Sequence, residues 1–123
     1  MNNIQQEFLD YCRSGNLNKV KKLLKDSRVD PSDGDNYAIR HSSGNGYIEV
    51  VRELLKDSRV DPSAMSNYAI RLSSRNGHLD VVRELIKDPR INKHELLNIH
   101  ITDELRSIIL TELRNESINK VIT

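Results

Sequence analysis

The chain has 123 residues, of which 37% are hydrophobic and only 4% are aromatic, and its formal net charge is +1. This composition predicts one domain with a modest aliphatic core. The nearly balanced charge does not indicate binding to nucleic acid or to an anionic membrane. Residues 1–13 lack the apolar segment of a signal peptide, and no apolar run is long enough to span a bilayer. The single cysteine, Cys12, cannot form an internal disulfide. We therefore expect a soluble, intracellular and cytoplasmic protein.

The first predicted helix covers residues 5–13. Its apolar residues Phe8, Leu9 and Cys12 lie at positions i, i+1 and i+4 on one face, while the other positions are polar, as the outer face of a terminal repeat requires. The second predicted helix carries the one basic cluster of the chain, which consists of Lys19, Lys21, Lys22, Lys25 and Arg28. No aromatic residues alternate with these cations, so a solvated helix face is favoured over stacking on nucleic-acid bases.

The chain repeats itself with a period of 31 residues. Segment 67–90 is identical to segment 36–59 at 17 of 24 positions, where chance predicts roughly one or two matches. The glycines Gly15, Gly46 and Gly77 have the same spacing. Such a period is typical of a solenoid, in which each unit buries its apolar face against the next.

The unit that covers residues 67–92 shows what one repeat contains. Residues 68–74 predict a short helix that ends at Gly77, because glycine tolerates the left-handed backbone at a helix C-terminus. Residues 79–87 predict a second helix, whose apolar residues share one face: Val81, Val82, Leu85 and Ile86. Pro89 prevents this helix from continuing, and the polar residues between units predict an extended loop.

The C-terminal part departs from the repeat motif. Residues 93–98 predict a short helix, and Thr102 predicts the N-cap of an amphipathic helix that ends near Arg114. We interpret residues 93–114 as a divergent fourth unit that caps the stack, and we expect residues 115–123 to fray. The predicted single domain thus covers residues 1–123, with repeats at about 4–32, 36–63 and 67–92.

The segment from Asn76 to Ile86, Asn-Gly-His-Leu-Asp-Val-Val-Arg-Glu-Leu-Ile, resembles the Asn-Gly-His-x-x-Val-Val-x-x-Leu-Leu motif of ankyrin repeats. The resemblance covers about residues 4–92. It implies an all-α, ankyrin-like helix–turn–helix solenoid of three clear repeats with a divergent C-terminal capping helix pair. The unit is shorter than the usual one of about 33 residues. It looks like the short subtype that is abundant in giant DNA viruses and amoebae, and a viral protein of this kind would lie in the host cell.

Arg40 and Arg71 stand where the family has the histidine of its Thr-Pro-Leu-His motif. In the family this histidine ties neighbouring loops together through hydrogen bonds. We hypothesise that each arginine pairs with the loop that contains Asp30 or Asp61, because a guanidinium group offers several donors to a carboxylate or to backbone carbonyls. The alternative is that both arginines are exposed helix charges.

No group of residues predicts a catalytic centre, a cofactor site or a metal site. The histidines lack the spacing of zinc ligands, so we interpret them as structural or surface residues: His41, His78, His94 and His100. The pairs Ser42-Ser43 and Ser73-Ser74 lack a nucleophile turn and occupy the positions of paired alanines in the family. The acidic residues of the first inter-repeat loop suit turn formation better than calcium binding: Asp30, Asp33 and Asp35.

The resemblance implies that a protein partner binds along the loop tips and the exposed side of the first helices. The predicted partner-binding residues at these positions are Asp33, Asp35, Asn36, Tyr37, Met65, Ser66, Asn67, Tyr68 and Arg75. Residues 33–35 and 64–66 differ between two otherwise similar units, which suits a surface shaped for a partner. The sequence leaves open which protein the partner is, and whether the chain acts as an inhibitor or an adaptor.

The alternative function is structural, in which the stack associates with a second copy through its ends. The apolar face of residues 105–113 would then continue the stack in the second copy, and the chain would form a weak homo-oligomer instead of a monomer. A catalytic function finds no support in the residues, and we expect neither a nucleic-acid nor a membrane partner.

Overall fold

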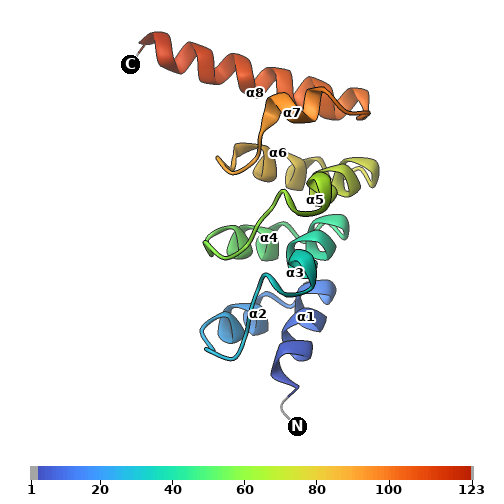
Figure 1. Ribbon diagram of the computed structural model, residues 1–123, viewed down its shortest axis with the longest axis vertical. Coiled ribbons are helices and arrows are strands. Elements are labelled where there is room, and N and C mark those ends of the chain that lie inside the picture. The colour runs from blue at the N-terminus through green and yellow to red at the C-terminus, as the bar shows by residue number, and fades with distance from the viewer. Residues whose placement is uncertain (1–2, 123) are drawn as a thin grey trace.

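The computed structural model describes residues 3–122, which form a stack of helix pairs (Figure 1). The first helices of the pairs lie in one column and the second helices in a neighbouring column. The described helices are α1 (Ile4–Ser14), α2 (Leu17–Leu24), α3 (Asp33–Gly44), α4 (Ile48–Leu55), α5 (Ala64–Arg75), α6 (Leu79–Lys87), α7 (Lys93–Leu97) and α8 (Asp103–Ile122). The predicted all-α solenoid of three helix pairs with C-terminal helices is confirmed. None of these described helices is long and apolar enough to cross a membrane.

The second helix of each pair buries one aliphatic stripe. The buried residues are Val20 and Leu23 in α2, Val50, Val51 and Leu54 in α4, and Val81, Val82, Leu85 and Ile86 in α6. Residues at this spacing share one face of an α-helix, which is why a short polar sequence with few apolar residues still builds a core. The helix predicted over residues 79–87 is confirmed by α6.

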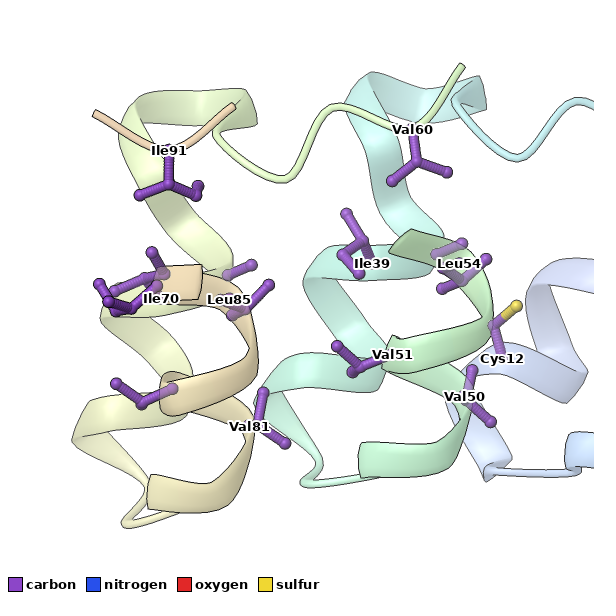
Figure 2. Close-up of a cluster of buried hydrophobic side chains, with 14 of the residues drawn as sticks. Cys12, Ile39, Val50, Val51, Leu54, Val60, Ile70, Val81, Leu85 and Ile91 are labelled. Carbon is purple, nitrogen blue, oxygen red and sulfur yellow. The ribbon is translucent and has the colours of Figure 1, made fainter. Parts of the chain in front are cut away.

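Aliphatic side chains from successive pairs meet between the columns (Figure 2). Val60 and Ile91 lie in the segments between the pairs and point toward the helices, and they are only 1% and 4% exposed. These segments are therefore anchored to the core. Burial of one such side chain contributes about 1.5–3 kcal/mol, so contacts between layers supply the stability that an isolated short helix pair lacks.

Helices α3 and α5 each begin with a compact left-handed turn, formed by residues 34–36 and 65–67. Every residue in these two turns has a φ angle between 52° and 66°. Regular helix starts at the tyrosine that follows, which confirms the short helix predicted over residues 68–74. The loop predicted between the units is present over residues 56–63, but residues 64–67, which were expected to belong to it, curl tightly into the start of α5. Side chains other than glycine and asparagine rarely favour this conformation, so the sequence signal for it is weak.

The C-terminal cap consists of α7 and α8, which lie across the end of the stack (Figure 1). Thr102 is the predicted N-cap of α8, since its Oγ1 accepts a hydrogen bond from the Leu105 backbone N–H at 3.1 Å. Leu105 and Ile109 are fully buried against the core. This burial contradicts the idea that the apolar face of residues 105–113 is free to continue the stack in a second copy, because the third helix pair already covers it.

Helix α8 continues to Ile122, beyond the end predicted near Arg114. The expectation that residues 115–123 fray is therefore wrong for residues 115–122, and Thr123 lies outside the described residues. No proline or glycine interrupts the segment, and the Lys93 Nζ atom forms an ion pair of 2.9 Å with the Glu116 carboxylate. This contact fixes the first turn of the extension to the cap, and the end of α8 projects past the other helices (Figure 1).

Candidate functional site

The two left-handed turns carry the side chains that were predicted to contact a partner. Asp33, Asp35, Met65 and Ser66 are exposed, and we call these four residues the loop-tip surface. Met65 is 52% exposed and is the one large apolar side chain among these four residues. These four positions thus remain candidates for partner contacts.

Asn36 and Asn67 do not belong to this surface, because each is only 8% exposed. The Asn36 Oδ1 atom accepts a hydrogen bond of 2.7 Å from the backbone N–H of Asp61. Gln5, which lies 31 residues before Asn36, accepts an equivalent bond of 2.8 Å from the Asp30 backbone N–H. The side chains of Gln5 and Asn36 therefore tie the first two pairs to the next inter-repeat loop, and the prediction of Asn36 as a partner-binding residue is corrected to a structural role. The Asn67 Oδ1 atom is also buried but has no hydrogen-bond partner among the described residues, so this tie is not repeated at the third pair. The 31-residue register that Gln5 shares with Asn36 was the sequence signal for the tie.

Arg40 and Arg71 hold the left-handed turns closed. Arg40 donates hydrogen bonds of 3.0 Å from Nε to the Asp35 carbonyl and from Nη2 to the Gly34 carbonyl. Arg71 repeats this pattern on the second turn, with bonds of 2.9 and 3.3 Å. The hypothesis that each arginine pairs with the preceding loop is confirmed for the backbone carbonyls. The Asp30 carboxylate instead accepts bonds from the Ser32 backbone N–H and hydroxyl group, as expected for a turn former.

The two tyrosines of the predicted surface are half-buried among cations. The Tyr68 ring lies between Arg40 and Arg71, whose guanidinium carbons are 5.2 and 5.9 Å from the ring centroid. The Tyr37 ring lies 3.9 Å from the His41 ring, measured between centroids. Burial, followed by the charge of nearby arginines, lowers the pKa of His41 below its ordinary value of 6.5. Both tyrosines are half-buried, so part of each side chain stays accessible at the surface.

Arg75 lies at the end of α5 and is exposed. Within residues 3–122 its side chain makes no hydrogen bond or ion pair. It lines a hollow of about 240 Å³ between α5 and the start of α8, which we call the cap hollow; further lining residues are Arg71, Ser74, His100, Ile101, Thr102 and Leu105. Of the predicted partner-binding residues, Arg75 is the one cation, and no ion pair among the described residues neutralises its charge.

A family model described as ankyrin repeats (3 copies) matches residues 8–95. The chain belongs to the ankyrin-repeat family. No curated protein and no solved structure matches it significantly. Ankyrin repeats are in general protein-interaction modules, so the surface built from the loop tips and first helices is the appropriate place to look for function.

A second arginine series joins the ankyrin repeats on the edge formed by the inter-repeat loops. Arg28, Arg59 and Arg90 each bind the aspartate two residues earlier, with the shortest contacts between 2.7 and 2.8 Å. Arg90 also donates hydrogen bonds to the carbonyls of Leu55 and Val60 in the preceding loop. This series was not predicted, although the Asp-x-Arg pattern recurs every 31 residues. Arg28 was expected on the second helix, whereas α2 ends at Leu24.

These arginine–aspartate pairs have a structural role. The hydrogen bond from each arginine is the main reason why the pKa of its aspartate is lowered, and for Asp26 the pKa falls to about 2. Asp57 and Asp88 are shifted in the same direction. All three carboxylates are therefore ionised acceptors at neutral pH, engaged by their own loops.

The possible nucleophiles Ser42, Ser73 and Cys12 are buried in the packed interior of the ankyrin repeats. The hydroxyl groups of Ser42 and Ser73 donate to the carbonyls of Ala38 and Ala69 at 2.8 and 2.7 Å, within their own helices. Cys12 is fully buried, and burial raises the pKa of its thiol to about 12. In the described part of the chain, no three histidine, cysteine or acidic side chains converge as metal ligands.

Proposed function

We propose that this ankyrin-repeat protein is a non-catalytic scaffold that binds a partner protein through the loop-tip surface and the exposed side of its first helices. The family supports the general role, since ankyrin repeats are protein-interaction modules. A comparison of the two equivalent left-handed turns, residues 34–36 and 65–67, gives a specific reason to select this face.

Met65 carries the proposal. It occupies the same register as Gly34, 31 residues earlier, and both have left-handed backbone with φ angles of 55° and 66°. A left-handed conformation costs about 1–2 kcal/mol for a residue other than glycine. Because Met65 is 52% exposed, burial inside the chain repays little of that cost. The Met65 side chain is flexible and exposed on a strained turn, so it is suited to contact an apolar site on a partner protein.

The proposal is tested by photo-crosslinking in cells. A benzophenone amino acid replaces Met65 in one variant and Lys87, an exposed residue of α6, in the control variant. We expect a discrete crosslinked protein from position 65 and none from position 87. Equal labelling from both positions, or none from position 65, would contradict the proposal.

A substitution then separates binding from folding. Met65→Gly is expected to raise the free energy of unfolding by about 0.5–1 kcal/mol, because glycine relieves the strain but gains entropy in the unfolded chain. The same variant should bind the crosslinked partner more weakly, by about tenfold. Lys87→Gly serves as the matched control and should leave partner binding unchanged. Loss of binding together with loss of stability would assign Met65 a folding role instead.

Self-association is the second candidate, and one observation favours it. A hollow of about 510 Å³ lies at the N-terminal end of the stack, where its lining includes Tyr11, Lys22 and Leu23. A second copy that covered this end would bury the apolar part of the lining. Light scattering over a range of concentrations tests this candidate, and a constant monomer mass would contradict it.

We further infer an intracellular location, in the host cell if the protein is viral. The support is the buried free thiol of Cys12 and the likeness of the 31-residue unit to the short ankyrin subtype of giant DNA viruses and amoebae. Imaging of the tagged protein in its native cell tests this inference, and a signal outside the cell would overturn it.

A further inference from the structure

The lining of the cap hollow contains both positively charged and apolar side chains. Its arginines, Arg71 and Arg75, come from α5, and its lining contains no carboxylate. Ile101 contributes aliphatic surface from the cap, and Leu105 lies beneath it in the core. This combination occurs at the junction between the third ankyrin repeat and α8, on the first-helix side of the stack.

Arg71 is held in place but not neutralised. Its Nε and Nη2 atoms donate to the carbonyls of Ser66 and Met65, which fixes the plane of the guanidinium group. Carbonyl oxygens carry no formal charge, and no carboxylate among residues 3–122 forms an ion pair with Arg71. A fixed guanidinium group loses little conformational freedom when it binds an anion, so its position favours binding.

Arg75 adds a second cation four residues later on the same helix. It has no hydrogen bond or ion pair within the described chain, although most other arginines of the structure have one. Ser74 and Thr102 stand in the wall beside it, and their hydroxyl oxygens are 2.8 Å apart. This bond joins α5 to the start of α8 and keeps the two sides of the hollow together.

The chemistry of the wall favours a peptide over a nucleic acid. Ile101 is half-buried and lines the hollow, so an aliphatic neighbour of the bound anion would find an apolar contact there. Phosphate chains require a row of cations, whereas here the exposed acids Asp103 and Glu104 directly follow the lining residue Thr102. A single carboxylate beside an apolar side chain fits these features better.

We infer that the cap hollow binds the carboxylate of one aspartate or glutamate that adjoins an aliphatic residue in a segment of the partner protein. The guanidinium groups of Arg71 and Arg75 supply charge-assisted hydrogen bonds, and Ile101 contacts the aliphatic neighbour. This inference rests on the proposed function and names the chemistry of the partner segment. The loop-tip surface, which includes Met65, would contact a different part of the same partner.

The test selects a phage library of random 12-residue peptides on the immobilised full chain. Enriched peptides are then measured by fluorescence polarisation against the intact protein and three variants. Arg75→Glu inverts the charge in the hollow. Arg83→Glu makes the same change on α6, at an exposed arginine that also has no ion pair among the described residues, and serves as the matched control. Met65→Gly probes the loop-tip surface, and the melting temperature of each variant checks folding.

We expect enriched peptides with an excess of Asp and Glu, whose affinity falls about tenfold or more for Arg75→Glu and less than about twofold for Arg83→Glu. Neutral or basic peptides that bind through Met65 would overturn this inference and leave the proposed function standing. Peptides that respond to neither Arg75→Glu nor Met65→Gly would count against both. An absence of enriched peptides, or displacement of the acidic peptides by a single-stranded oligonucleotide, would also overturn the acidic-peptide site.

Discussion

The imidazole ring of His78 packs against Gly46 of the preceding repeat, so closely that a Cβ atom on the glycine would lie 2.6 Å from Nδ1. The Tyr47 ring packs against Gly15 in the same way, where a Cβ atom would lie 2.7 Å from Cδ1. Gly77 ends the series, and a Cβ atom there would have no neighbour within 4 Å, because no further repeat supplies a ring. In the second and third repeats, the residue after the turn glycine, Tyr47 or His78, therefore packs against the turn glycine of the previous repeat.

This series makes Gly46 and Gly77 a matched pair for mutation. Their φ angles are 81° and 79°, so alanine causes the same backbone strain of about 1–2 kcal/mol at either site. Gly46→Ala additionally drives its methyl group into the His78 ring, and we expect a total loss of about 3 kcal/mol. Urea denaturation measures both free energies of unfolding. Equal losses would show that the ring contact does not restrict position 46.

The second prediction concerns the arginines that join the loops. Arg90 donates to several carbonyls of the preceding loop in addition to Asp88, whereas among residues 3–122 the Arg28 side chain donates to the Asp26 carboxylate alone. Arg90→Ala should therefore lower the free energy of unfolding by about 2 kcal/mol, since it removes these bonds together with the donor to the part-buried Val60 carbonyl. Arg28→Ala should have the smallest effect of the series, with Arg59→Ala between the two. Chemical denaturation in the same buffer checks the order, and a larger loss for Arg28 than for Arg90 would contradict it.

The third prediction concerns the dependence of stability on pH. His41 has a lowered pKa in the folded protein, mainly because burial disfavours its charged form, so the unfolded chain binds more protons as the pH falls through about 6.5. Its contribution is fully present above that value and is lost as the pH falls toward the folded-state pKa. The wild type should therefore lose stability between pH 7.5 and 5.5, measured as the urea midpoint.

Replacement of His41 isolates the contribution of this histidine to the pH dependence of stability. His41→Gln should lose less stability than the wild type over the same pH interval, and His94→Gln, at an exposed site, should follow the wild type. The paired aspartates do not interfere in this interval, because their pKa values are lowered from 3.8. Parallel pH profiles for His41→Gln and the wild type would refute the assignment.

The fourth prediction concerns Cys12. Its thiol is fully buried, and its pKa of about 12 leaves little reactive thiolate at pH 8. The folded protein should react with a disulfide reagent far more slowly than the same chain in concentrated urea. The reaction rate should also increase in Gly46→Ala, because the rate follows the population of opened molecules. Rapid labelling of the native protein would show that the first repeat opens on its own.

The sequence by itself determined the solenoid. The 31-residue period, the turn glycines and the aliphatic stripe of residues 79–87 depend on local spacing, and a helix forms its apolar face from residues three and four apart whatever the neighbours are. The N-cap of α8 at Thr102 is equally local. For that reason the helices, the repeat number and the family could all be anticipated from the chain.

Only the tertiary structure decided the details of the candidate surface. Asn36 looked like an exposed loop residue, yet it binds a backbone N–H that lies 25 residues later in the chain. Helix α8 extends past Arg114, and Lys93, brought beside it by the cap, pairs with Glu116 there. The cap hollow exists because α5 and the start of α8, 28 residues apart at the Ser74–Thr102 bond, come into contact. Such partners are set by the distance and angle between stacked layers, which depend on the packing of all the buried side chains together and on no single local pattern.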